Sequence, residues 1–241
     1  MDFKQNFKTS LKRHFPGPVY SYLGNKNKYL GERNKIFKHL EIDVLFDVGA
    51  NVGFYAHVVR NTGFNGKIVS FEPQKVAFNK MLRLSDNDDN WIVRNFGLGA
   101  ENKITEINIS SNSVSSSILE NVSLLNQLCH EAEYTGKESI EIKRFDSIVD
   151  EFCSFEDNLF VKIDTQGYEY EVIEGCLGCL DRIKGFQLEL SFMELYKGER
   201  TYLDMILYMK NLGFELVKIE PGWNDPLTGY AVEIDGIFVK K

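Results

Sequence analysis

The segment Val44–Tyr55 constrains the fold of this chain more than any other stretch of its 241 residues. An apolar run ends in an acid, Asp47, turns through two spaced glycines, Gly49 and Gly53, and restarts as an apolar-periodic segment. This order predicts a buried strand, a tight turn and the first turn of a helix, which is where α/β folds bind nucleotides. The glycines let the backbone approach a ligand more closely than side chains would allow.

The turn differs from the dinucleotide-binding fingerprint G-x-G-x-x-G. Asn51 stands where the second glycine belongs, and Tyr55 and Ala56 follow where the third would be. A carboxylate at Asp47 would repel a pyrophosphate, but it suits an ammonium or a hydroxyl group. The pattern therefore indicates a nucleoside that has no diphosphate and carries a cationic end, which is the chemistry of S-adenosylmethionine.

A second acid supports this interpretation. The strand-like run Lys67–Phe71 ends in Glu72 and Pro73, nineteen residues after Gly53. An acid at the end of the second strand, about twenty residues past the glycine turn, can accept hydrogen bonds from a ribose diol.

Past residue 40 the chain alternates strand-like and helix-like segments, so we expect an α/β fold with a Rossmann-like, seven-stranded sheet and helices on both faces. Strands are expected at Val44–Val48, Lys67–Phe71, Trp91–Phe96, Leu159–Ile163, Gly185–Leu190, Phe214–Ile219 and Ile234–Val239. Helices are expected near Val52–Thr62, Lys75–Ser85, Glu169–Leu180 and Tyr202–Leu212. No helix separates the last two strands, so they should pair antiparallel and make the sheet mixed.

The expected organisation is an N-terminal helical arm over residues 1–40 and a core domain over residues 41–241. The arm and an insertion in the domain are not needed for the core fold. The domain contains an insertion at 97–147, in which two alternating runs, Ile104–Ile109 and Ile140–Ile142, predict extra strands. The serine-rich Ser110–Ser117 between them predicts a flexible loop that could face a substrate.

The arm has an amphipathic pattern, because Phe3, Phe7, Leu11 and Phe15 recur every four residues beside lysines. Such a helix could lie on a membrane surface, or it could pack on the main domain or on a second subunit. We prefer packing on protein, so a homo-oligomer formed through the arm is possible.

Charge and composition limit which binding partners and which cellular compartment we expect. The net charge of −7 divides into +7 over residues 1–40 and −14 over the rest, and an acidic main domain argues against nucleic acid. No apolar run reaches the roughly 18 residues of a membrane span, and no signal-peptide core begins the chain. Four cysteines without a secretory signal indicate reduced thiols. We therefore expect a cytoplasmic protein without a transmembrane segment.

The motifs of the chain together resemble the FkbM family of class I S-adenosylmethionine-dependent methyltransferases, from about Leu45 to the C-terminus. The segments that carry the resemblance are Phe46–Gly53 (FDVGANVG), Phe71–Pro73 (FEP), Ser115–Ser117 (SSS), Arg144–Ile148 (RFDSI), Val161–Glu169 (VKIDTQGYE), Glu174–Cys176 (EGC) and Leu188–Ser191 (LELS). Family members act on varied small molecules and glycans, so the resemblance does not identify the substrate.

The resemblance also implies roles for individual residues. The methionine end of the cofactor would lie against the glycine turn, lined by Asp47, Gly49, Ala50, Asn51 and Gly53. Glu72 would hold the ribose, and Asn95 and Gly97 would lie near the adenine.

Asp164 ends the fourth strand at the edge of the sheet where a catalytic base belongs. A hydroxyl acceptor must lose a proton, so a general base assists its methylation. Glu189 ends the fifth strand nearby, and the two acids could tune each other's pKa or together bind a divalent cation. Asp164 could instead cap the helix that follows it, as Asp146 is expected to cap a helix of its own.

His130, in the insertion, is a further candidate for a base on the acceptor side. Cys176 and Cys179 have a C-x-x-C spacing, but no second pair of ligands exists, so we expect two packed core thiols and no dedicated metal site. A divalent cation at the two acids has no support in the sequence.

These observations favour an S-adenosylmethionine-dependent methyltransferase that acts on a hydroxyl of a sugar, a nucleotide-linked sugar or a glycan precursor. An alternative keeps the fold but methylates an amine, a carboxylate or a phosphate-type oxygen of a small metabolite. A dinucleotide-dependent oxidoreductase is disfavoured by Asn51 and Asp47. A non-catalytic binding module is disfavoured because Asp47, Glu72 and Asp164 are all present.

Overall fold

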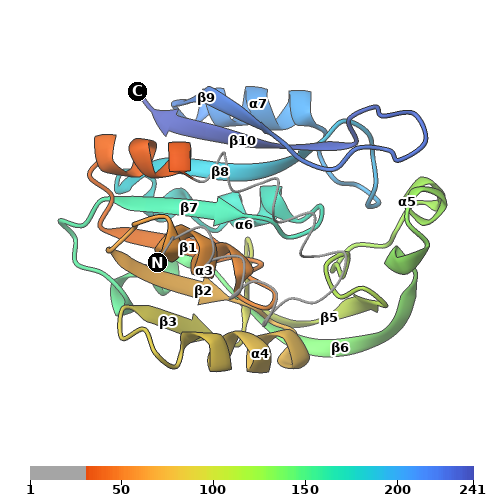
Figure 1. Cartoon of the computed structure of the whole chain (residues 1–241), viewed down its shortest axis with the longest axis horizontal. Coiled ribbons are helices and arrows are strands. Elements are labelled where there is room, and N and C mark those ends of the chain that lie inside the picture. The colour runs from red at the N-terminus through yellow and green to blue at the C-terminus, as the bar shows by residue number, and fades with distance from the viewer. Residues whose placement is uncertain (1–30) are drawn as a thin grey trace, which may run out of the picture.

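The computed structural model describes residues 31–241 and shows an α/β fold built around a seven-stranded mixed sheet (Figure 1). From one edge to the other the strands are β3 (Trp91–Arg94), β2 (Lys67–Phe71), β1 (Val44–Val48), β7 (Leu159–Ile163), β8 (Ile183–Ser191), β10 (Glu233–Lys240) and β9 (Phe214–Pro221). Neighbouring strands pair in parallel from β3 to β8, whereas β10 pairs antiparallel with both β8 and β9. The predicted mixed sheet with an antiparallel last pair is confirmed.

Helices cover both faces of the sheet because the central strands are apolar on both sides. Alternate residues of β1 point to opposite faces, so Phe46 joins one hydrophobic cluster and Leu45 the other. The helices are α3 (Phe54–Asn61), α4 (Lys75–Ser85), α5 (Ser123–Leu128), α6 (Glu169–Glu174) and α7 (Tyr202–Asn211). The α6 and α7 helices pack with the Phe46 cluster, and α3 packs with the Leu45 cluster.

Two helices are shorter than predicted, and each ends or begins beside a glycine. The first helix begins at Phe54 and not at Val52, because Gly53 adopts φ 83° in the left-handed region. The helix expected over Glu169–Leu180 ends at Glu174. There Gly175 packs so closely on the Gly99 carbonyl that a Cβ would lie 2.2 Å from its oxygen.

The insertion forms a second sheet of three strands in the order β4 (Gly97–Leu98), β6 (Tyr134–Lys143) and β5 (Lys103–Ser110). The two extra strands predicted there are confirmed, and both are longer than predicted. Figure 1 shows this sheet and α5 extending beyond the ends of β1 and β2.

The chain over residues 31–39 is helical and packs on the main sheet. Phe37 is 2% exposed, and its ring lies 4.8 Å from that of Phe160 and 5.5 Å from that of Phe64, centroid to centroid. Arg33 and Glu220 form a buried ion pair that joins the same helix to β9. The last ten residues of the predicted arm therefore contribute to the core of the domain.

The amphipathic pattern from Phe3 to Phe15 lies outside the described residues, so its packing and any oligomer formed through it remain predictions. Within residues 31–241, no helix combines the length and apolar character needed to cross a membrane.

The packing of the 31–39 helix can be tested by truncating its buried aromatic residue. Phe37→Ala should lower the free energy of unfolding by about 3–5 kcal/mol, the usual cost of removing a buried Phe side chain. Phe155→Ala is the control, because Phe155 is 78% exposed and its truncation should cost under about 1 kcal/mol. Urea denaturation measures both, and an equal effect of the two changes would contradict the assigned packing.

Candidate active site

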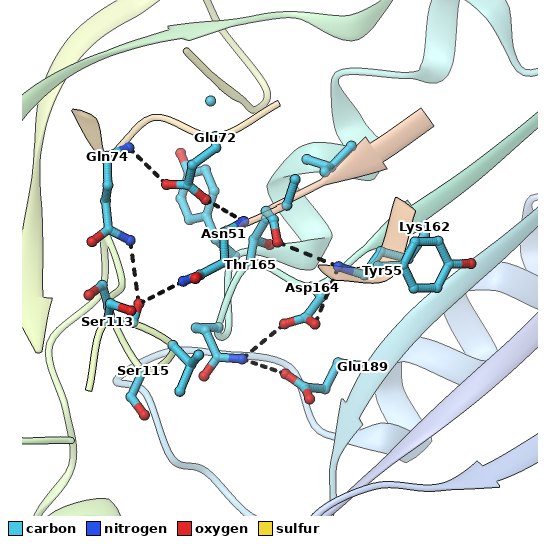
Figure 2. Close-up of a pocket in the computed structure, with 18 of the residues that line it drawn as sticks. Asn51, Tyr55, Glu72, Gln74, Ser113, Ser115, Lys162, Asp164, Thr165 and Glu189 are labelled. Atoms are coloured by element: carbon cyan, nitrogen blue, oxygen red, sulfur yellow. Dashed lines mark hydrogen bonds and ion pairs between the residues drawn. The ribbon is translucent and has the colours of Figure 1, made fainter. Parts of the chain in front are cut away.

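A cavity of about 490 Å³ opens at the carboxyl ends of β1, β2, β7 and β8, where open α/β sheets bind ligands. Its volume falls in the range typical of small-molecule and cofactor sites. The lining residues come from the glycine turn after β1, the end of β2, the insertion, the segment after β7, and the ends of β8 and β10. Figure 2 shows the polar side chains that point into it.

The glycine turn at one wall has three residues with positive φ: Gly49 at 72°, Asn51 at 49° and Gly53 at 83°. A Cβ on Gly49 would lie 1.9 Å from the carbonyl oxygen of Asp164, so only glycine lets the turn pack against the end of β7. The Asn51 side chain accepts a hydrogen bond from the Val52 N–H at 2.8 Å. Ala50 and Asn51 both line the cavity with Gly49.

Glu72 lies beside this turn at the end of β2 and lines the cavity although it is only 3% exposed. Its carboxylate accepts hydrogen bonds from the backbone N–H groups of Asn51 at 2.7 Å and Gln74 at 2.8 Å (Figure 2). Burial raises its pKa to about 7 despite these two hydrogen bonds. Each carboxylate oxygen retains a second lone pair for a ligand hydroxyl.

Asp47 lies behind the cavity wall and does not line it. It is completely buried, and its carboxylate is 3.2 Å from the ammonium nitrogen of Lys162 and 3.4 Å from the hydroxyl of Ser70. Burial raises the pKa of Asp47, and Lys162 opposes that rise. The cation next to Asp47 is therefore a lysine of the chain, and any contact of Asp47 with a bound cofactor would be indirect.

Lys162 is the main functional candidate that sequence reasoning missed. Its ammonium group lines the cavity and bridges Asp47 at 3.2 Å and Asp164 at 3.3 Å, while its side chain is only 6% exposed. Burial acts to lower the pKa of Lys162, but the neighbouring carboxylates of Asp164 and Asp47 outweigh burial and raise it. The signal in the sequence was a lysine inside the otherwise apolar strand Leu159–Ile163.

Asp164 and Glu189 lie close together, and the amide of Gln166 connects them. That amide nitrogen donates to Asp164 at 3.0 Å and to Glu189 at 2.6 Å (Figure 2). The hydroxyl of Tyr196 donates to the amide oxygen of Gln166 at 2.7 Å, which fixes the orientation of the amide. Gln166 itself has φ 57°, so the turn after β7 is held in a left-handed conformation.

The capping role considered for Asp164 is wrong. The N-cap of α6 is Tyr168, four residues further on, and no side chain caps this helix through a hydrogen bond. The N–H of Thr165 instead donates to the buried carboxylate of Glu169 at 2.7 Å.

The capping role expected of Asp146 is also wrong. Asp146 lies inside the short 3₁₀ helix Phe145–Ser147, where it pairs with Arg144 and accepts a hydrogen bond from the N–H of Gly178.

The remaining predicted residues divide between the cavity and its surroundings. Gly97 lines the cavity, whereas Asn95 lies outside it and donates to the carbonyls of Glu72 and Pro73, both at 2.9 Å. Asn95 thus holds the loop that positions Glu72. His130 is exposed on the 3₁₀ helix His130–Ala132, outside the lining, so the structure does not bring it to Asp164.

The serine-rich loop lies over the glycine turn. The carbonyl of Ser113 accepts hydrogen bonds from the side chains of Asn51 at 3.1 Å and Gln74 at 3.5 Å (Figure 2). Ser113, Ser115 and Ser116 line the cavity, so this loop forms part of its wall.

No group of three or more His, Cys, Asp or Glu side chains is arranged to hold a metal ion in the described part of the chain. The two acids that could share a cation, Asp164 and Glu189, both accept hydrogen bonds from Gln166.

Comparison with known proteins assigns this site to a family. The family model described as "Methyltransferase FkbM domain" matches residues 47–216. That range contains the glycine turn, Glu72, Lys162, Asp164 and Glu189. The chain belongs to the FkbM methyltransferase family, and its enzyme class is therefore that of the methyltransferases.

A solved methyltransferase structure shares the fold of this chain. Magnesium protoporphyrin IX methyltransferase ChlM from Synechocystis PCC 6803, solved with bound SAM, superposes with a TM-score of 0.52 at 8% identity, covering 100% of this chain and 98% of that chain. Aeropyrum pernix fibrillarin, solved with natively bound S-adenosyl-L-methionine, gives a TM-score of 0.47 at 10% identity, over 82% of this chain and 66% of that chain. No curated protein matches the sequence.

The ion pairs of Lys162 with Asp47 and Asp164 predict how its replacement changes the free energy of unfolding. Lys162→Met should lower the free energy of unfolding by about 3–5 kcal/mol at neutral pH, because it leaves the buried Asp47 carboxylate without its cation. The double variant Lys162→Met with Asp47→Asn should recover a substantial part of that loss. Urea denaturation of the three proteins checks this, and additive losses in the double variant would contradict a direct ion pair.

Proposed function

We propose that this protein is an S-adenosylmethionine-dependent O-methyltransferase whose acceptor is a hydroxyl of a sugar, a nucleotide-linked sugar or a glycan precursor, acting in the cytoplasm. The observation that carries the proposal is the position of Asp164. Its carboxylate lines the cavity between the glycine turn and the acceptor side, where Lys162 and Gln166 hold it in place.

The residues present fit the proposed cofactor. A buried carboxylate at Glu72, with both oxygens already ordered by backbone N–H groups, suits a ribose diol that donates two hydrogen bonds. Beside it, Gly97, Leu98 and Ile142 offer a largely apolar surface for a flat base. Position 51 is an asparagine where the dinucleotide fingerprint has a glycine, and position 47 is an acid. Both agree with a ligand that has no diphosphate.

The cofactor, when bound, would supply a methyl group on a sulfonium, which is already an activated electrophile. The protein must then orient the acceptor and remove a proton. Asp164 would accept the proton of the acceptor hydroxyl through the carboxylate oxygen that faces the cavity. Lys162 places a positive charge 3.3 Å from that carboxylate, which favours its ionised form before the proton arrives.

Orientation would come from the groups around Asp164. Gln166 is fixed by Tyr196 and holds Asp164 and Glu189 in one arrangement, so both acids face the same acceptor. A preorganised base lowers the barrier because little reorganisation is needed when the acceptor arrives. The carboxylates at this end would also repel an acceptor that presents a phosphate or carboxylate there, which favours a hydroxyl acceptor.

Cofactor binding provides the first test, with S-adenosylhomocysteine as the ligand. We expect a dissociation constant in the micromolar range, roughly −8 kcal/mol, and no measurable binding of NAD. Because a ligand diol donates to the ionised Glu72, affinity should rise by up to about tenfold between pH 6 and pH 8, as the carboxyl with a pKa of about 7 loses its proton. Calorimetry measures this, with Glu72→Gln as the variant that should bind weakly and lose the pH dependence. NAD binding without S-adenosylhomocysteine binding would overturn the proposal.

Asp164→Asn tests the assignment of the base. Asparagine keeps the size and the hydrogen bond from Gln166 but cannot accept a proton, so methyl transfer should fall by ~10²–10⁴ while S-adenosylhomocysteine still binds. The measurement is transfer of radiolabelled methyl to a panel of sugars and sugar nucleotides. Glu106→Gln, a change at an exposed residue of β5 that does not line the cavity, is the control. Activity of Asp164→Asn within a few-fold of the wild type would remove Asp164 from the catalytic role.

A further inference from the structure

The cavity extends along the edge of the sheet past the residues proposed to bind the cofactor. The glycine turn and Glu72 follow β1 and β2, and Asp164 follows β7. Beyond Asp164 the lining continues along β8 and β10 to Trp223, in the loop that joins β9 to β10. Glu233 at the start of β10 pairs with Ser191 at the end of β8, so this loop leaves the sheet at the edge where the glycine turn lies. Figure 1 shows the loop at the same end of the molecule as α5.

The backbone that carries Trp223 is held against the first residues of β10. The carbonyl of Trp223 accepts hydrogen bonds from the N–H groups of Val232 at 2.9 Å and Glu233 at 3.1 Å. Gly222, just before it, packs so closely on the Glu233 carbonyl that a Cβ would lie 2.4 Å from the oxygen. Trp223 therefore has a fixed position at the start of β10.

The strand order places Trp223 in the acceptor half of the cavity. In the order β1-β7-β8-β10, the strand beside Trp223 is three positions from β1 and two from β7. Strands lie about 4.8 Å apart, so β10 is about 14 Å from β1 and about 10 Å from β7 across the sheet. A cofactor held at β1 and β2 lies on the far side of Asp164 from Trp223, whereas an acceptor at Asp164 can extend to it.

The indole ring of Trp223 contacts both the cavity and a small apolar cluster, against which it is partly buried. The cluster consists of the buried side chains Leu125, Ala132, Leu195, Tyr196 and Val232. Within residues 31–241 the indole N–H of Trp223 donates no hydrogen bond, whereas that of Trp91 donates to the Ser70 hydroxyl at 2.9 Å. Packing on the cluster does not use the whole ring, so its N–H and the surface that lines the cavity can contact a ligand.

The polar side chains in this half of the cavity are hydrogen-bond acceptors. The carboxylates of Asp164 and Glu189 line it, together with the amide of Gln166. Carboxylate oxygens have several lone pairs, so they can accept from a ligand hydroxyl in addition to the contacts that they already make. An aromatic surface and hydrogen-bond acceptors in one cavity suit a ligand that has both an apolar face and hydroxyl groups.

A pyranose ring has this character, because its hydroxyl groups project from the rim and its C–H bonds make the faces apolar. The face of an aromatic ring carries partial negative charge, which attracts the weakly positive C–H hydrogens. An open-chain polyol has similar hydroxyls but no ring face, and a flat aromatic molecule has a face but few hydroxyls. The combination of groups therefore favours a sugar ring over both.

We propose that Trp223 is the platform on which the ring of a pyranose acceptor stacks, with one hydroxyl of that ring directed to Asp164. The inference rests on the proposed function, because it requires that a sugar occupies the acceptor half of the cavity. It adds the residue that selects a ring over an open chain.

The first experiment asks which ligand this half of the cavity selects, in full-length protein saturated with S-adenosylhomocysteine. The probes are glucose, galactose, the open-chain polyol sorbitol and the aromatic diol catechol, and saturation-transfer NMR measures their binding. At least one of the two pyranoses should bind about tenfold or more tighter than sorbitol and catechol, because only a pyranose combines a ring face with a rim of hydroxyls.

The second experiment asks whether Trp223 acts through its aromatic face or only through packing. Trp223→Phe keeps an aromatic face and should bind the preferred pyranose within about threefold of the wild type. Trp223→Leu keeps apolar contact with the cluster but has no such face, so it should bind that sugar about tenfold or more weakly. Both should keep the wild-type affinity for S-adenosylhomocysteine. Tyr230→Leu is the matched control, because Tyr230 is in the same loop, is 75% exposed and does not line the cavity.

Tryptophan fluorescence gives an independent measurement, since the chain contains two tryptophans and Trp91 is only 6% exposed. The preferred pyranose should change the emission of the wild type and leave that of Trp223→Phe unchanged. An equal change in both proteins would contradict contact between the sugar and Trp223.

Each other result has a definite meaning. Failure of S-adenosylhomocysteine itself to bind would contradict the proposed function. If S-adenosylhomocysteine binds but neither pyranose exceeds sorbitol, or if catechol binds tightest, the assignment of a sugar ring is wrong. If Trp223→Leu binds the sugar as the wild type does, or loses affinity for S-adenosylhomocysteine and the sugar alike with a lower melting temperature, Trp223 serves the fold and the proposal is overturned.

Discussion

The ammonium group of Lys162 is the contact on which the site depends, because it joins a fully buried acid to an acid that faces the cavity. Asp47 on β1 and Asp164 after β7 lie 3.2 Å and 3.3 Å from it. Buried charges such as those of Asp47 and Lys162 are tolerated only when they are paired. Without Lys162, Asp47 would be a buried charge behind the glycine turn, and Asp164 would lose the cation that holds it at the mouth of the cavity. The ion pairs of Lys162 therefore serve both the stability of the fold and the proposed chemistry at Asp164.

The same bridge belongs to a polar row that crosses the sheet on one face. Register pairs Asp47 with Lys162 and Lys162 with Gln187. Gln187 accepts a hydrogen bond from Tyr55 on α3 and donates one to Asp235 on β10. The row thus runs from β1, which the glycine turn follows, to β10, whose Glu233 and Asp235 line the cavity. A rigid row of this kind fixes the distance between the two halves of the cavity, which a transfer reaction between two bound molecules requires.

Much of the fold could be predicted because it depends on local patterns. Apolar runs bounded by turns located every strand of the main sheet, and the missing helix between β9 and β10 predicted their antiparallel pairing. The site could be predicted only where its residues lie at strand ends: Glu72 and Asp164 directly follow β2 and β7, and Glu189 lies near the end of β8. Lys162 was missed because its role depends on two residues that only the folded chain brings to it, Asp47 and Asp164. Asp47 was expected to face the cofactor, but its carboxylate is buried and pairs with Lys162. The surroundings of His130 and Asn95 are set by loops, whose conformations the sequence pattern does not determine.

A crystal structure of the complex with S-adenosylhomocysteine tests the central claim most directly, because it reports the position of each part of the ligand relative to these side chains. The account predicts that both ribose hydroxyls lie within hydrogen-bonding distance of the Glu72 carboxylate. It also predicts that the sulfur faces the open space beside Asp164, with Lys162 still bridging Asp47 and Asp164. A ligand bound away from the glycine turn, or a sulfur directed away from Asp164, would contradict it.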